Sequence, residues 1–139
     1  MLTAETNFLA LAACGVAAMV IGMVWYSPML FGSAWMKATG LSKKDIDSSK
    51  SGMQKIYGMS FILYLVMAYV LNLVIRNLGG INTAIEGAQV GFWMWLGFIA
   101  TTLLINSLYQ FKKKNLFLID SFYQLANLSV MGAMLAVWI

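Results

Sequence analysis

Four long apolar runs occupy most of this chain of 139 residues. They extend over about 8–26, 53–75, 87–109 and 116–138. Each run is close to the ~20 residues that an α-helix needs to cross a hydrocarbon core about 30 Å thick. A helix also satisfies its own backbone hydrogen bonds, as a segment in lipid must. The sequence therefore predicts an all-α integral membrane protein, a four-helix bundle that forms a single transmembrane domain over residues 1–139.

The composition excludes an ordinary soluble domain. Hydrophobic residues make up 61% of the chain and charged residues 10%, whereas a soluble domain carries about 25% charged residues. The net charge of +4 does not indicate a nucleic-acid surface, because the basic residues lie between the apolar runs. We therefore expect the lipid bilayer as a partner and no nucleic acid.

The distribution of Lys and Arg predicts the topology. The connections after the first and third runs hold all the basic residues except Arg76, which lies in the second connection. Short loops rich in Lys and Arg stay cytoplasmic. We therefore expect the first and third connections on the cytoplasmic side and both termini on the opposite side. The basic residues of these two connections are Lys37, Lys43, Lys44, Lys50 and Lys55, and then Lys112, Lys113 and Lys114.

The first apolar run is not expected to be a signal peptide, because Glu5 precedes it and no Lys or Arg does. The segment from Leu11 to Cys14 is similar to a bacterial lipoprotein cleavage box. The run continues unbroken to Tyr26, which favours a small residue inside a membrane helix instead. A single cysteine forms no internal disulfide.

The first run ends in an aromatic segment that contains the only proline, Pro28. Proline pushes the preceding residue out of the helical region, so Ser27 is predicted to cap a new helix that begins at Pro28. We expect residues 28–39 to form a short helix in the cytoplasmic interface, and a re-entrant hairpin is the alternative. The residues of this interfacial motif are Trp25, Tyr26, Ser27, Pro28, Phe31, Gly32 and Trp35.

The fourth run carries a stripe of polar side chains. Asp120, Tyr123, Gln124 and Asn127 follow the i, i+3, i+4, i+7 spacing of one helical face. Polar groups are costly in hydrocarbon, so this face should point into the protein. The stripe either holds the helices together or borders a polar cavity or path that opens toward the cytoplasm.

The third run carries a second polar face with Thr102 and Asn106. The link between the last two runs is short, which makes them antiparallel neighbours. Asn106 should then lie at the depth of Asp120, and Thr102 at the depth of Gln124. The candidate ligand or ion path comprises Thr102, Asn106, Asp120, Tyr123, Gln124 and Asn127.

Asp120 is the one acidic residue well inside an apolar run. It is either an interfacial carboxylate that pairs with Lys112–Lys114 near the start of its helix or a cation or proton site. No catalytic residue, metal site or cofactor is expected. The chain has no histidine and none of the HExxH, P-loop, GxSxG or CxxC motifs, so we expect no enzymatic activity.

Small residues recur at helical spacing in three of the runs. Gly87 and Gly91 form a GxxxG pattern, and Gly132 with Ala136 continues it in the fourth run. Such patterns allow close helix contact, either within the bundle or between subunits. Because four short spans enclose little room, we expect a homo-oligomer.

The segment from Trp25 to Trp35, followed by Gly40, resembles the signature of a bacterial membrane family catalogued as "domain of unknown function 1761". Two further blocks are similar to that family, one from Trp95 to Asn106 and one from Leu118 to Gly132. The resemblance implies a small four-span protein of the bacterial inner membrane and supplies no activity. Members of the family often carry Asn at the position of Asp120, which argues against a charged site there as a family-wide function.

Two functions are compatible with these patterns. In the first, the protein binds or passes a small solute or ion by means of its polar helix face. In the second, the protein is a structural or accessory subunit of a membrane assembly with an unidentified partner, and the polar residues only join helices.

Overall fold

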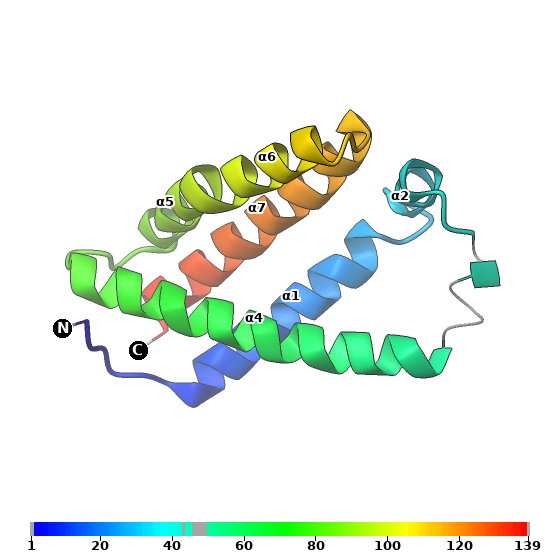
Figure 1. Cartoon of the computed structure of the whole chain (residues 1–139). Helices are drawn as coiled ribbons and strands as arrows, with labels where there is room; N and C mark the ends of the chain where they lie inside the picture. The colour runs from blue at the N-terminus through cyan, green and yellow to red at the C-terminus, as the bar shows by residue number, and fades with distance from the viewer. Residues whose placement is uncertain (1, 43, 46–49, 139) are drawn as a thin grey trace.

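The computed structural model describes residues 2–42, 44–45 and 50–138, and over these residues the chain is all-helical. Lys43, one of the lysines of the first connection, lies outside the described residues. Figure 1 shows the helices packed side by side, with the two termini at the same end of the molecule. The helices are α1 (Phe8–Trp25), α2 (Gly32–Thr39), α4 (Lys50–Leu78), α5 (Ala84–Met94), η1 (Trp95–Ala100), α6 (Thr101–Tyr109) and α7 (Lys114–Val137).

Three of the described helices are long and apolar enough to cross a lipid bilayer. They cover Phe8–Trp25, Gly52–Leu78 and Ala84–Tyr109, and the last of them combines α5, η1 and α6. They correspond to the first three predicted spans. The fourth predicted span, α7, does not reach the same apolarity, because it carries the polar stripe. Length and composition thus support three spans, and the crossing by α7 stays a prediction.

Helix α7 occupies the centre of the molecule. It packs against α1, α4 and α5, and also against α2, η1 and α6. In Figure 1 it runs along the underside of α5 and α6, with α1 and α4 on its other side. The three helices that are apolar enough to span a bilayer therefore all pack against α7, which carries the polar stripe. This is the arrangement that a polar helix face requires in lipid. The buried residues of α7 are Ile119, Ser121, Tyr123, Asn127, Leu128, Met131, Gly132, Leu135 and Ala136.

Glycines bring α5 and α7 into close contact. A Cβ atom at Gly87 would collide with the carbonyl oxygen of Gly132, and one at Gly91 would collide with that of Leu128. A Cβ atom at Gly132 would likewise collide with the carbonyl oxygen of Gly87. The GxxxG pattern therefore serves helix contact within the chain, one of the two alternatives that the sequence left open.

A π-helical turn, η1, shifts the inward face of the third span by one residue. The buried face of α5 follows Val90 and Gly91 to Trp95. An uninterrupted α-helix would continue this face through Thr102 and Asn106, but the extra residue of a π turn rotates the remainder of the helix about its axis. Leu103 and Ser107 consequently face inward and are partly buried, while Thr102 and Asn106 are exposed.

The short helix after α1 starts later than the sequence predicts. It begins at Gly32 rather than at Pro28, because the amide N–H groups of Leu30 and Gly32 both donate to the Ser27 carbonyl and form turns instead. The Ser27 hydroxyl does not cap a helix but donates to the Val24 carbonyl at 2.7 Å. Gly40 ends α2 in the left-handed conformation, with φ of 77°.

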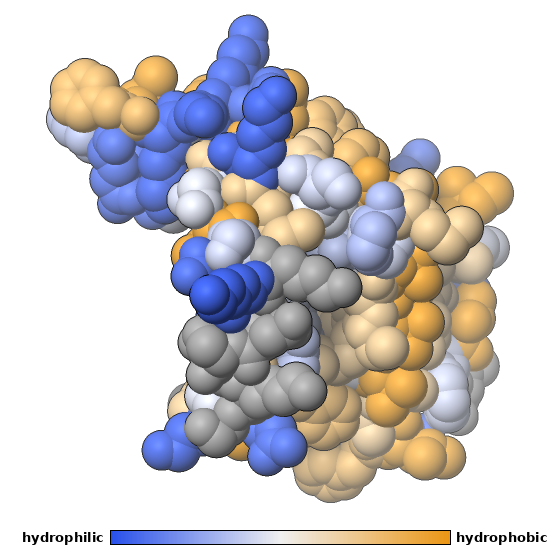
Figure 2. Space-filling view, turned by 90° about the vertical axis from the view of Figure 1, so that its right-hand side faces the viewer, coloured by the Kyte–Doolittle hydropathy of each residue, from blue (hydrophilic) through white to orange (hydrophobic). Residues whose placement is uncertain are grey.

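Hydrophilic side chains gather at one end of the molecule. Figure 2 views the end that carries α2 and the link between α6 and α7, where blue side chains lie beside an extensive orange flank. The opposite end carries both termini, and the Asn77 amide there donates to the Thr3 carbonyl at 2.9 Å. The two termini thus lie at the same end of the molecule, and their side of the membrane stays a prediction.

Candidate functional site

The aromatic segment that follows α1 docks onto the polar face of α7. The Trp25 indole N–H donates to the Ile119 carbonyl at 3.0 Å, and the Tyr26 hydroxyl donates to Oδ1 of Asp120 at 2.6 Å. The interfacial motif is therefore more than a break between helices. It covers the end of the α7 stripe that lies nearer the link between α6 and α7.

A tight turn positions these side chains. A Cβ atom at Gly32 would collide with the Tyr26 carbonyl oxygen, so only glycine permits the chain to turn this closely. The turn stacks Phe31 on Trp25, with ring centroids 4.8 Å apart, and brings Trp35 to 5.9 Å from the Tyr26 ring. Aromatic pairs of this kind add about 0.5–1.5 kcal/mol beyond the area they bury. The motif residues thus hold one another in place above α7.

Tyr123 joins three helices through its hydroxyl group. It donates to the Ala18 carbonyl of α1 at 2.9 Å and lies 2.9 Å from the Tyr64 hydroxyl of α4. A phenol has a single proton, so Tyr64 must be the donor of the second bond. Gly22 makes room for this arrangement, because a Cβ atom there would lie 2.8 Å from the Tyr123 hydroxyl.

Deeper in the protein, the polar face of α7 is only partly satisfied. Asn127 is 0% exposed, and neither its amide nitrogen nor its amide oxygen has a hydrogen-bond partner among the described residues. The same holds for Oε1 of Gln124 and for the Ser121 hydroxyl. The Tyr64 hydroxyl neighbours the Gln124 and Asn127 side chains, at longer range than a hydrogen bond. Unpaired polar groups of this kind are rare in protein interiors and call for an explanation.

Asp120 connects this interior to the end of the molecule that carries the link between α6 and α7. It is partly buried, and it also lines a hollow of about 70 Å³ together with Asn106, Ser107 and Lys112. The predicted proximity of Asn106 and Asp120 is therefore confirmed, although the Asn106 side chain is exposed. One oxygen of the Asp120 carboxylate accepts from Tyr26, and charge attraction acts between the carboxylate and Lys112.

The structure brings together four of the six candidate site residues as one inward face: Asp120, Tyr123, Gln124 and Asn127. Asn106 reaches the edge of this face at the hollow. Thr102, the remaining candidate, is exposed and does not join this face. The π turn of η1 is the physical reason, because it rotates α6 by one residue.

Sequence reasoning missed two contributors to the site. Tyr64 lies in the second run, and nothing in the sequence connects it with Tyr123. The buried Trp95 indole donates to the Ser121 carbonyl at 2.6 Å and so ties η1 to α7.

Burial, followed by its hydrogen bond to Asp120, raises the pKa of Tyr26 far above the ordinary value for a phenol. Tyr26 therefore stays protonated and acts as a donor.

An apolar layer separates this site from the end that carries the termini. Beyond Asn127, the inward face of α7 continues with Met131 and Leu135, which are 1% and 2% exposed. They pack with Cys14 and Leu71 in the hydrophobic core. The polar face of α7 is thus open toward the end that carries the link between α6 and α7, and closed toward the end that carries the termini.

Comparison with known proteins identifies a family and no individual relative. No curated protein matches the chain, and no solved structure does. A family model described as "Protein of unknown function (DUF1761)" matches residues 9–136, which is nearly the whole chain. The chain therefore belongs to this family of proteins of unknown function, DUF1761.

Proposed function

We propose that this protein crosses the membrane four times and binds a small cation or hydrogen-bond-donating solute at Asp120, from the cytoplasmic side. The observation that carries the proposal is the position of the Asp120 carboxylate. It lies between the Tyr26 hydroxyl, 2.6 Å away, and a hollow of about 70 Å³ at the surface. The Trp35 indole also interacts with this carboxylate. A carboxylate has about four acceptor positions, so positions remain for a ligand in the hollow.

The surroundings of Asp120 suit a small, positively polarised ligand. Asn106 and Ser107 line the hollow and offer an amide and a hydroxyl group. A hollow of about 70 Å³ admits a monovalent cation or a few small atoms but no metabolite of ordinary size. Lys112 lines the same hollow and is the cation that such a ligand would displace from the carboxylate. The donor set therefore favours this class of ligand.

Binding is favoured over passage. A permeation path needs polar groups or water along its whole length, and the apolar layer formed by Met131 and Leu135 interrupts the polar face of α7. The unpaired amide of Asn127 lies at the inner end of the polar region. A site that ends at an apolar layer suits retention of a ligand rather than its passage. The proposed role is accordingly non-enzymatic and without transport.

The topology belongs to the same proposal. We place the link between α6 and α7 in the cytoplasm and both termini on the other side of a bacterial cytoplasmic membrane, following the distribution of lysines. The crossing by α7 is favoured by its burial among three apolar helices. We also propose a homo-oligomer, because the exposed surface of α6 carries the polar side chains of Thr102 and Asn106, which would face lipid in a monomer. The mass of the detergent-solubilised complex tests the last point, and a monomeric mass contradicts it.

An accessory role is the second candidate, and one observation favours it. The donors of Trp25, Tyr26, Trp95 and Tyr123 all point to partners within the chain. In this alternative the polar face serves only to hold the helices together, and an unidentified membrane partner provides the function. Asp120→Asn separates the two candidates, because an asparagine can still accept the Tyr26 hydrogen bond but carries no charge.

The experiment measures the thermal unfolding of the purified protein in detergent, in NaCl, KCl, NH4Cl and methylammonium chloride at equal ionic strength. A ligand that binds the folded state at a hundred times its Kd stabilises that state by about 2.7 kcal/mol. We expect one of these cations to raise the Tm of the wild type and to leave Asp120→Asn unchanged. Glu5→Gln, which removes a carboxylate at the opposite end, is the matched control and should respond as the wild type does.

Two results would overturn the proposal. The first is a wild-type Tm that is the same in all four salts. The second is an equal rise of Tm in Asp120→Asn and in the wild type. Either result leaves the accessory role as the better account of the polar face.

A further inference from the structure

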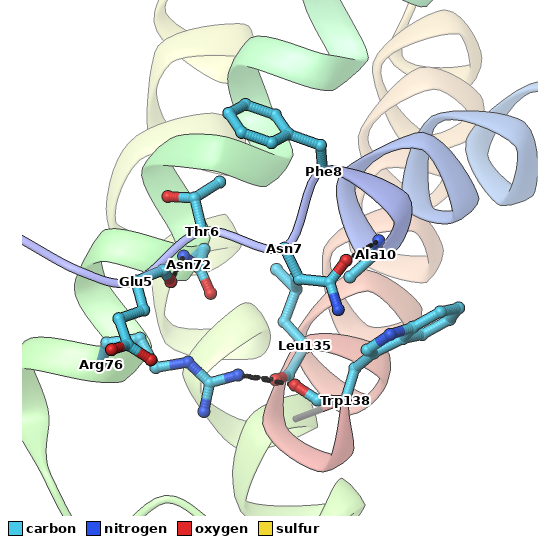
Figure 3. Close-up of a pocket in the computed structure, with 9 residues that line it drawn as sticks. All are labelled: Glu5, Thr6, Asn7, Phe8, Ala10, Asn72, Arg76, Leu135 and Trp138. Carbon is cyan, nitrogen blue, oxygen red and sulfur yellow. Dashed lines mark hydrogen bonds between the residues drawn. The ribbon is translucent and has the colours of Figure 1, made fainter.

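A second polar cavity lies at the opposite end of the molecule, beside both termini. It has a volume of about 540 Å³ and is enclosed by the segment before α1, the end of α4 and the end of α7. Figure 3 shows its lining side chains, among them Glu5, Asn7, Asn72, Arg76 and Trp138. None of these residues belongs to the Asp120 site.

Arg76 is the one cationic side chain among the described residues that line this cavity, and it is held in a fixed position. Its Nη2 donates to the Leu135 carbonyl at 2.7 Å and to the Trp138 carbonyl at 2.9 Å. These bonds cap the C-terminal end of α7, where a positive charge also interacts well with the helix dipole. A guanidinium has five N–H donors in a rigid fork, so further donors remain for an anion in the cavity.

Glu5 supplies the opposite charge. Its carboxylate lines the same cavity, and no hydrogen bond joins it to the Arg76 guanidinium in Figure 3. The backbone of this segment is anchored, because the buried Asn72 amide donates to the Glu5 carbonyl at 3.2 Å. Among the residues that the structure describes, this cavity therefore presents a cation and an anion with no hydrogen bond between them. A ligand that carries both charges is complementary to such a site.

The location of the cavity identifies the source of such a ligand. In the proposed topology it lies at the membrane surface, where phospholipid headgroups lie. Trp138 lines it, and tryptophan favours the headgroup level. Phe8, which is 78% exposed, lies at the same cavity and offers an apolar surface to acyl chains.

We propose that this cavity binds the headgroup of an ethanolamine phospholipid, with the phosphate at Arg76 and the ammonium group at Glu5. A primary ammonium can donate hydrogen bonds to a carboxylate, whereas the quaternary ammonium of choline cannot. The site should therefore prefer ethanolamine over choline lipids, and over glycerol lipids that have no ammonium group. This inference rests on the membrane topology proposed above and not on ligand binding at Asp120.

The test uses the full chain in detergent, with added phosphatidylethanolamine, phosphatidylcholine or phosphatidylglycerol of identical acyl chains. The affinities come from native mass spectrometry. We expect wild type to bind the ethanolamine lipid most tightly. Glu5→Gln should bind it about tenfold more weakly, because a charge-assisted hydrogen bond is lost, and should no longer distinguish it from the choline lipid. Asp120→Asn is the control and should retain the preference, whatever its behaviour toward cations.

Arg76→Gln should weaken binding of all three lipids, because their phosphate is shared. Arg76 also caps α7, so its substitution disturbs the helix as well as the cavity. The Glu5 side chain caps no helix, and Glu5→Gln therefore provides the independent test. The proposal is overturned if wild type binds ethanolamine and choline lipids equally or if Glu5→Gln keeps the preference. Soluble glycerophosphoethanolamine, which has the same headgroup and no acyl chains, distinguishes a membrane lipid from a free solute as the ligand. Binding as tight as that of the lipid would identify a free solute as the ligand and would overturn the assignment to lipid.

Discussion

The Tyr26 hydroxyl donates a 2.6 Å hydrogen bond to Asp120, a residue that lies 94 positions further along the chain. This bond joins the turn after α1 to the start of the central helix. Together with the bond from Trp25 to the Ile119 carbonyl, it fixes the aromatic motif above the polar face of α7. The motif and the polar face are therefore one structural unit.

A double-mutant cycle of Tyr26→Phe and Asp120→Asn measures how much the charge of Asp120 contributes to this hydrogen bond. Hydrogen bonds to charged groups contribute about 1.5–3 kcal/mol, and those to neutral groups about 0.5–1.5 kcal/mol. We expect a coupling free energy of about 1 kcal/mol in the unfolding of the detergent-solubilised protein. A coupling energy of zero would mean that the charge of Asp120 adds nothing to its hydrogen bond with Tyr26.

Tyr123→Phe should destabilise the protein by about 1 kcal/mol, since interhelical hydrogen bonds within membranes average about 0.6 kcal/mol and a buried donor is also left unpaired. The variant loses the bond to the Ala18 carbonyl and deprives the Tyr64 hydroxyl of its acceptor. Chemical unfolding in bicelles measures the loss. Tyr57→Phe is the matched control, because Tyr57 is 54% exposed and should change stability little. Equal effects of the two substitutions would contradict the role of Tyr123.

Gly91→Ala should destabilise the contact between α5 and α7 by about 1–3 kcal/mol, the usual cost of overpacking. A Cβ atom at Gly91 collides with the backbone of Leu128, which cannot move aside as a side chain would. Gly58→Ala is the control, because no atom lies within 4 Å of a Cβ built there. It should be neutral or stabilising, by up to about 1 kcal/mol, since alanine favours the helix. A Gly91→Ala protein as stable as wild type would show that the two helices are further apart.

The π turn predicts an unusual tolerance to deletion. Removal of Gly97 from η1 should convert this turn to regular α-helix and keep Leu103 and Ser107 on the inward face. Removal of Leu104, which lies in α6 beyond the end of η1, should rotate the rest of α6 away from α7. We expect the first deletion variant to retain a cooperative unfolding transition and the second to lose it, as followed by circular dichroism. Equal behaviour of the two deletions would contradict a π turn at this position.

Helical periodicity was sufficient to predict the inward face of α7. Asp120, Tyr123, Gln124 and Asn127 repeat at 3.6-residue spacing, and the cost of exposing them to lipid leaves one orientation. Gly87 and Gly91 likewise indicated a close helix contact, which the structure places against α7. These features depend on spacing within a single helix, and such spacing can be read from a sequence.

Features that depend on contacts between distant segments could not be predicted in this way. The partnership of Tyr26 with Asp120 and that of Tyr64 with Tyr123 are set by packing, not by local pattern. The π turn has no signature in a run as uniformly apolar as Trp95–Ala100, and it determines that Leu103 rather than Thr102 faces inward. The same turn explains why Asn106 reaches only the edge of the candidate site and why Thr102 does not reach it.

The crossing of the membrane by α7 is the claim on which the topology and both proposed sites depend. Single cysteines at Lys113 and Val137, at the two ends of α7, test it in a Cys14→Ser background with a membrane-impermeant maleimide on intact cells. We predict that the cysteine at 137 is labelled in intact cells and that the cysteine at 113 is labelled only after the membrane is opened. Labelling of both positions from the same side would show that α7 does not cross the membrane, and would contradict this account.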